Sequence, residues 1–190
     1  MTRDAENVSP PDLTPSGPFV MRVTATHVLA YFAAGLAALA TMQYEQRFAA
    51  DSMATLMPPI DDPLVAAGAG LQLVNGLVLG LVLAPFRAVL LGARGALDLF
   101  VLLVGVSLFS PQTPGPGNLE GLLYTRVPLA MHLASLPEVV AYSALVSTGL
   151  VWWCRKPARW KDRTAATLVV LVVVMSMLGV MDALGWLPSA

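Results

Sequence analysis

Three side chains in this sequence are of the types that acid–base chemistry on a lipid or a quinone requires. Glu45 and His132 could exchange a proton near neutral pH, and Arg126 could bind an anionic group. They are weak catalytic candidates, because no diagnostic spacing connects them: the chain has no Gly-x-Ser-x-Gly elbow and no His-Glu-x-x-His motif. Helix caps and interfacial anchors on a solvated surface explain the same side chains.

Four further polar residues lie within long apolar segments. Arg94 and Asp98 are four positions apart, a spacing that allows an intrahelical ion pair and lowers the cost of either charge in a membrane. Alternatively, Arg94 extends to the membrane surface and Asp98 accompanies it. Gln72 and Asn75 could form hydrogen bonds across a contact between two helices, or line a path for a ligand or an ion.

Small residues recur every four positions on both sides of Gln72. This spacing places them on one face of a helix, where they allow a second helix to approach closely. We therefore predict a helix-packing seam, which could join helices of one chain or of two. Its small residues are Gly68, Gly76, Gly80 and Ala84.

The sequence does not predict a cofactor or a metal site. We expect His27 near the inner end of the first span and His132 on the outer side, so the two rings cannot bind one haem or one zinc ion. The single cysteine, Cys154, excludes an internal disulfide and a site with several thiolates.

These residues must be positioned by membrane-spanning helices. The chain is 56% hydrophobic and only 12% charged, with a mean hydropathy of +0.69, which is typical of a membrane protein. A net charge of −1 gives no argument for a nucleic-acid partner. We predict an all-α integral membrane protein with five transmembrane helices, at about 23–42, 63–85, 92–109, 138–154 and 166–187.

Three local patterns set the boundaries. Residues 1–21 are rich in proline and acidic residues and are predicted to form a flexible cytoplasmic tail, and residues 22–190 a single bundle. Asp62-Pro63 is typical of a helix start. Ser135-x-x-Glu138 has the form of a capping box, so we expect the fourth span to begin there and residues 119–134 to form an interfacial helix on the outer side.

The charges predict the orientation. Five basic residues lie within positions 155–163, between the last two spans, and Arg22, Arg87 and Arg94 fall on the same side. The positive-inside rule then places the N-terminus in the cytoplasm and the C-terminus outside. We expect a multi-pass protein of a cell membrane, specifically a bacterial inner membrane.

The sequence is compatible with three kinds of function. The leading hypothesis is a structural or accessory membrane subunit whose partners are the lipid bilayer and other membrane subunits or further copies of itself. One alternative is a small oligomeric transporter or channel, which would use Gln72, Asn75, Arg94 and Asp98. Another is a membrane enzyme that acts on a lipid or a quinone at the outer surface.

Overall fold

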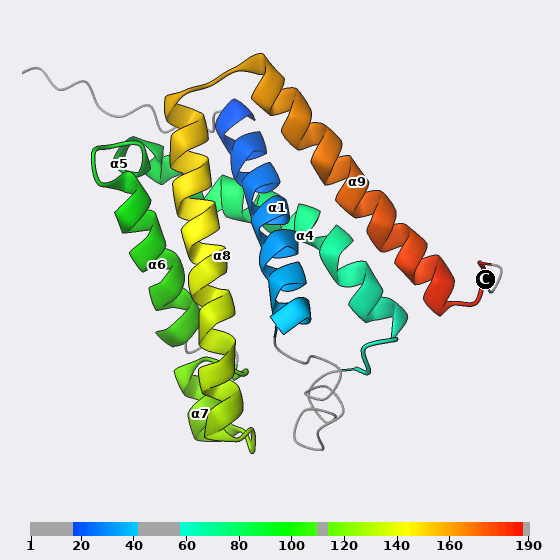
Figure 1. The fold of residues 1–190 in the computed structure, drawn as a ribbon. Helices are drawn as coiled ribbons and strands as arrows, with labels where there is room; N and C mark the ends of the chain where they lie inside the picture. The colour runs from blue at the N-terminus through cyan, green and yellow to red at the C-terminus, as the bar shows by residue number, and fades with distance from the viewer. Residues whose placement is uncertain (1–16, 42–57, 110–113, 188–190) are drawn as a thin grey trace, which may run out of the picture.

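The computed structural model describes residues 17–41, 58–109 and 114–187, and every regular element in these ranges is a helix. Figure 1 shows their arrangement. The longer helices are α1 (Gly17–Thr41), α4 (Pro63–Leu83), α6 (Gly95–Phe109), α8 (Leu129–Arg155) and α9 (Arg159–Ala183). The short ones are η1 (Ala84–Phe86) and α5 (Arg87–Leu90), which extend α4, and α7 (Leu119–Tyr124).

Four of these helices are long and apolar enough to cross a membrane. They are α1, α4 with its continuation to Leu90, α8 and α9. The fifth apolar helix, α6, has only 15 residues, about 22 Å at 1.5 Å per residue against a hydrocarbon core of about 30 Å. Large leucine, valine and methionine side chains cover the outside of the helices, as contact with acyl chains requires.

Helix α1 is the centre of the bundle. It packs against α4, α8 and α9, whereas α6 packs mainly against α8, at the side of the bundle away from α9. Helix α4 crosses behind α1 in Figure 1 and also contacts α9. Polar side chains of α1 therefore have three neighbouring helices from which to take partners.

Most of the basic residues in the described ranges lie at one end of the bundle. At the end we call the basic end, α1 and α9 begin and α8 finishes, so Arg22 and the cluster at 155–163 lie together. At the opposite end Asp62 caps α4: its carboxylate accepts a hydrogen bond of 2.7 Å from the backbone N–H of Leu64, and Pro63 is the first helical residue. The predicted helix start at Asp62-Pro63 is confirmed.

The predicted start at Ser135 is wrong. Helix α8 begins at Leu129 and continues through Pro137, and the Ser135 hydroxyl donates to the His132 carbonyl at 2.8 Å instead of capping a helix. The predicted helix at 119–134 is consequently divided between α7 and the first turns of α8. A proline removes one backbone hydrogen bond, whereas a break in the helix would leave several polar groups without partners in an apolar environment.

The first helix also begins earlier than expected. We predicted a tail as far as residue 21, but α1 starts at Gly17, and Phe19 and Val20 are buried against the rest of the bundle. Pro18 does not prevent this, since proline is tolerated in the first turn, where its missing N–H would have no partner within the helix. The predicted tail otherwise falls outside the described residues.

Candidate functional site

A cluster of four polar side chains joins three helices inside the bundle. His27 of α1 lies between two partners: its Nδ1 is 2.6 Å from the hydroxyl of Tyr142 of α8, and its Nε2 is 2.9 Å from Oε1 of Gln72 of α4. Asn75 extends the cluster, because its amide donates to the same Gln72 oxygen at 3.1 Å. We call His27, Gln72, Asn75 and Tyr142 the central clasp.

The hydrogen bonds of the central clasp fit a neutral His27 side chain. The Gln72 amide nitrogen donates to the Gly68 carbonyl at 3.3 Å, which is consistent with its oxygen facing the ring. In this arrangement Nε2 of His27 donates to the Gln72 oxygen, and in the neutral ring the Tyr142 hydroxyl donates to Nδ1. Both ring nitrogens of a neutral histidine are thereby satisfied, and only 8% of the residue is exposed.

The surroundings of the clasp suit a structural hydrogen-bond network. The Tyr142 ring meets the His27 ring edge-on, with centroids 5.6 Å apart, and Tyr31 lies one helical turn along α1 at 6.4 Å. Among the described residues no group of three histidine, cysteine or acidic side chains is arranged to bind a metal ion. The clasp connects α1, α4 and α8 through neutral donors and acceptors, and the low polarity around it strengthens each bond.

Two glycines of the predicted packing stripe set the distance between α1 and α4. A Cβ atom on Gly76 would lie 3.0 Å from the Thr24 backbone, and one on Gly80 would lie 2.9 Å from the Val20 carbonyl oxygen. Ala84 is fully buried, whereas a Cβ atom on Gly68 would meet nothing within 4 Å. The stripe therefore contacts α1 of the same chain over its second half.

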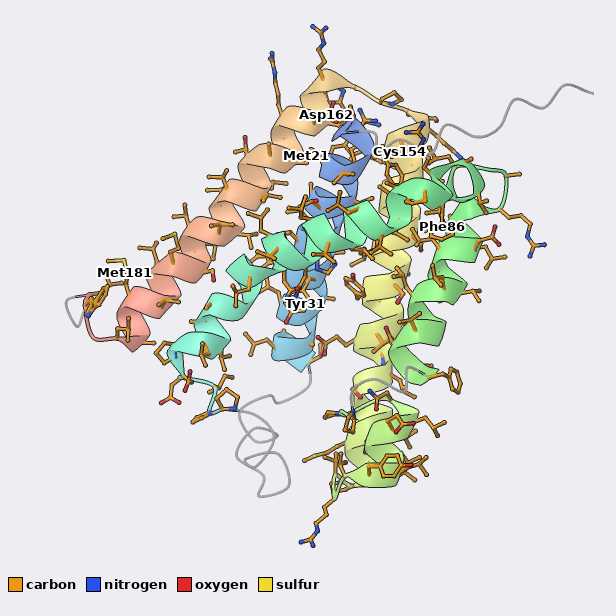
Figure 2. The ribbon with its side chains drawn as sticks, turned by 180° about the vertical axis from the view of Figure 1, so that it is seen from behind. Met21, Tyr31, Phe86, Cys154, Asp162 and Met181 are labelled. Carbon is orange, nitrogen blue, oxygen red and sulfur yellow. The ribbon has the colours of Figure 1, made fainter. Side chains whose placement is uncertain are left out.

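A second polar cluster lies at the basic end. Asp162 of α9 accepts from Nε of Arg22 at 3.0 Å, from Nη2 of Arg22 at 3.4 Å and from the indole N–H of Trp153 of α8 at 3.0 Å. The Arg22 guanidinium also lies 5.9 Å from the centre of the Trp153 ring. We call Arg22, Trp153 and Asp162 the basic-end cluster. It ties α1, α8 and α9 together, and Figure 2 labels Asp162 beside Met21 at this end.

Replacing Asp162 by asparagine is expected to lower the melting temperature of the purified protein. The neutral amide loses the charge that pairs with Arg22, and its NH2 group replaces the oxygen that accepts from Nη2 of Arg22. Asp182→Asn, an exposed carboxyl near the other end of α9, is the matched control and should leave the melting temperature unchanged. The comparison is made by thermal unfolding in detergent. Equal shifts for the two variants would contradict a stabilising role of the basic-end cluster.

Of the two alternatives for Arg94 and Asp98, the intrahelical ion pair is absent from the described structure. Arg94 lies in the turn before α6, not within a span, and the contact between the two residues is a backbone hydrogen bond of 3.0 Å from the Asp98 N–H to the Arg94 carbonyl. Asp98 lies in the first turn of α6. A carboxylate is stabilised there by the positive end of the helix dipole and does not need the arginine.

The structure describes two of the three weak catalytic candidates. Glu45 lies outside the described residues. Arg126 is exposed between α7 and α8. His132 is 95% buried, and its Nδ1 accepts from the backbone N–H of Gly117 at 3.0 Å. Tyr142, the partner of His27, is ten residues further along α8, about 15 Å. This distance separates the two histidines along the bundle.

Fold and site together describe an all-helical protein with four helices long and apolar enough to cross a membrane. The central clasp, the close packing of α1 on α4 and an ion pair at one end hold these helices together. Comparisons with protein-family models, curated proteins and solved structures found no match to this chain.

Reasoning from the sequence missed the partners of several residues. It did not connect His27 with Gln72, and it did not single out Tyr142, although all three lie toward the middle of their helices in the structure. The expected spans at 23–42 and 138–154 put His27 near the inner side and Tyr142 near the outer side, so the two residues did not match in depth. Asp162 carried a signal that was overlooked: it is the sole acidic residue within the basic stretch at 155–163.

Proposed function

We propose that this protein is a structural or accessory membrane subunit that associates with a second transmembrane helix through the outer face of α4. The observation that carries the proposal is the position of Asn75. It is exposed, and it lies 12 residues into α4, about 18 Å along the helix. An exposed amide at this depth meets hydrocarbon unless another helix covers it.

Asn75 uses only part of its hydrogen-bonding capacity in the described structure. Its amide donates once, to Gln72, while an asparagine side chain can donate twice and accept at its oxygen. The apolar residues on the same face are more than half exposed, as a surface available to another helix should be. They are Leu71, Val78 and Val82.

The central clasp favours this role over a transport path. Gln72 and Asn75 were the residues expected to line such a path, but Gln72 is bonded to His27, to Asn75 and to the Gly68 carbonyl. Opening a path along them would require these bonds to break. The hypothesis of an outer-surface enzyme gains no support from His132, whose Nδ1 is bonded to Gly117.

The same proposal includes the membrane topology. With α6 as a fifth crossing, the chain would pass the membrane five times, with the basic end in the cytoplasm according to the positive-inside rule. Support comes from the basic cluster at 155–163 at one end and from Asp62 at the other. A bacterial inner membrane is the location that we propose.

Replacing Asn75 by leucine tests the proposed association. One interhelical hydrogen bond in a membrane is worth about 0.6–1.7 kcal/mol, so we expect binding of the second helix to weaken about 3- to 17-fold. The mass of the complex is measured by light scattering in mild detergent, and co-purifying proteins are identified by mass spectrometry. Val78→Leu, on the same face but without an amide, is the control and should bind as the wild type does.

Two results would contradict the proposal. One is a wild-type protein that is a stable monomer without membrane partners, particularly if it shows measurable turnover. The other is an assembly of unchanged stability in Asn75→Leu.

A further inference from the structure

An apolar groove of about 500 Å³ opens between α1 and α9, with α4 behind it. Met21 of α1, Leu73 of α4 and Val170 of α9 line its walls, and the basic-end cluster closes one end. Its volume is in the range of sites that bind small ligands. Figure 2 shows Met21 and Asp162 at the end where the groove begins.

The length of the groove matches one leaflet of a bilayer. Its lining on α9 extends from Asp162 to Val174, which is 12 residues or about 18 Å. Half of a hydrocarbon core is about 15 Å thick. An acyl chain that enters the groove beside the basic end would therefore end near the middle of the membrane.

The mouth of the groove is positively charged. Within the described residues, Asp162 forms an ion pair with Arg22, and neither Arg159 nor Arg163 forms one. Ala166 and Val170 line the groove, and Arg159 and Arg163 precede them at spacings of four and three. This spacing places the two arginines on the same side of α9, at the end of the groove beside Asp162. Both arginines are exposed and available to an anion.

We infer that this groove binds an anionic phospholipid from the leaflet that meets the basic end. One acyl chain lies along Met21, Leu73 and Val170, and the phosphate lies at the mouth beside Arg159 and Arg163. Apolar walls and a cationic mouth complement the two parts of such a lipid. A zwitterionic phospholipid fits the apolar walls equally well, but the arginines at the mouth contribute less to its binding free energy.

The inference is tested on the full-length protein by native mass spectrometry in detergent, with added phosphatidylglycerol or phosphatidylcholine. We expect phosphatidylglycerol to bind more tightly. Arg163→Gln should weaken the binding of phosphatidylglycerol about fivefold, because one arginine near an anionic headgroup contributes about 1 kcal/mol of binding free energy. Lys156→Gln removes an exposed charge at the same end, from the turn between α8 and α9 and not from α9 itself, and should change binding less.

A second pair of variants tests the groove itself. Val170 lines it and is 59% exposed, and its neighbour Leu171 does not line it and is 51% exposed, so both accept a larger side chain without disturbing the core. Val170→Trp should weaken the binding of phosphatidylglycerol about 15-fold if the indole displaces two methylene groups. Leu171→Trp should bind as the wild type does. Equal melting temperatures without added lipid establish that both variants are folded.

Three outcomes would overturn the inference. The first is equal affinity for the two phospholipids. The second is an equal effect of Val170→Trp and Leu171→Trp. The third is competition by the deacylated headgroup, glycerophosphoglycerol, at the concentration where the intact lipid binds, because that would place recognition at the surface charges and not in the groove.

Discussion

Replacing His27 by leucine should lower the free energy of unfolding by about 1–3 kcal/mol, although the two side chains are similar in size. His27 makes two interhelical hydrogen bonds, to Tyr142 and to Gln72. In membrane proteins each is worth about 0.6–1.7 kcal/mol. Leucine would also leave the part-buried Tyr142 hydroxyl without its partner. The measurement is unfolding by SDS titration in mixed micelles, followed by tryptophan fluorescence.

Two further variants separate the hydrogen bonds from packing. Tyr142→Phe should lower the free energy of unfolding less than His27→Leu does, since Gln72 keeps its hydrogen bond to the His27 ring. The double variant should then be less destabilised than the sum of the two single variants, because both remove one shared bond. Tyr31→Phe is the control. It contacts the same histidine through its ring, and its unfolding free energy should stay within about 0.5 kcal/mol of the wild type. Additive effects of His27→Leu and Tyr142→Phe would show that the clasp does not couple α1 to α8.

The second large effect concerns the approach of α4 to α1. Gly80→Leu should destabilise the protein by about 3 kcal/mol or more, because the first added atom already lies 2.9 Å from a backbone oxygen of Val20 and the helices must separate. Gly68→Leu introduces the same side chain on the same helix, where a Cβ atom meets nothing within 4 Å. Its unfolding free energy should change by less than about 1 kcal/mol, since leucine also has the higher helix propensity.

The same SDS titration compares the two glycine variants. A free energy of unfolding that falls equally in both would mean that helix propensity or lipid contact, and not the α1–α4 distance, decides their stability. Gly76→Leu gives an independent check, because its Cβ atom would lie 3.0 Å from Thr24. Its free energy of unfolding should fall by about as much as that of Gly80→Leu.

The glycine packing and the central clasp act at the same contact between α1 and α4. A glycine contact brings two helices close but gives little directional preference, whereas hydrogen bonds in lipid fix the rotation of each helix about its axis. Gly76 lies one helical turn from Gln72 and against the His27 ring. Close approach and polar pairing therefore occur at the same point of contact, and weakening either should weaken the other.

The sequence by itself determined that the chain is helical, that several helices are long and apolar enough for a membrane, and where α4 begins. These features follow from composition and from patterns within a few residues, such as an aspartate before a proline. The same local reasoning misplaced the start of α8. A capping-box pattern states only what Ser135 and Glu138 can do at a helix start, and it does not include the cost of interrupting backbone hydrogen bonds in an apolar environment.

Only the tertiary structure decided which polar residues meet. Helical periodicity assigns Gln72 and the glycines to one face, but it gives neither the rotation of the helix in the bundle nor the identity of its neighbour. Gln72 and His27 are 45 positions apart, and Asp162 and Arg22 are 140 apart. Such contacts depend on the packing of whole helices, which no local pattern encodes. The clasp, the basic-end cluster and the groove beside it arise from that packing.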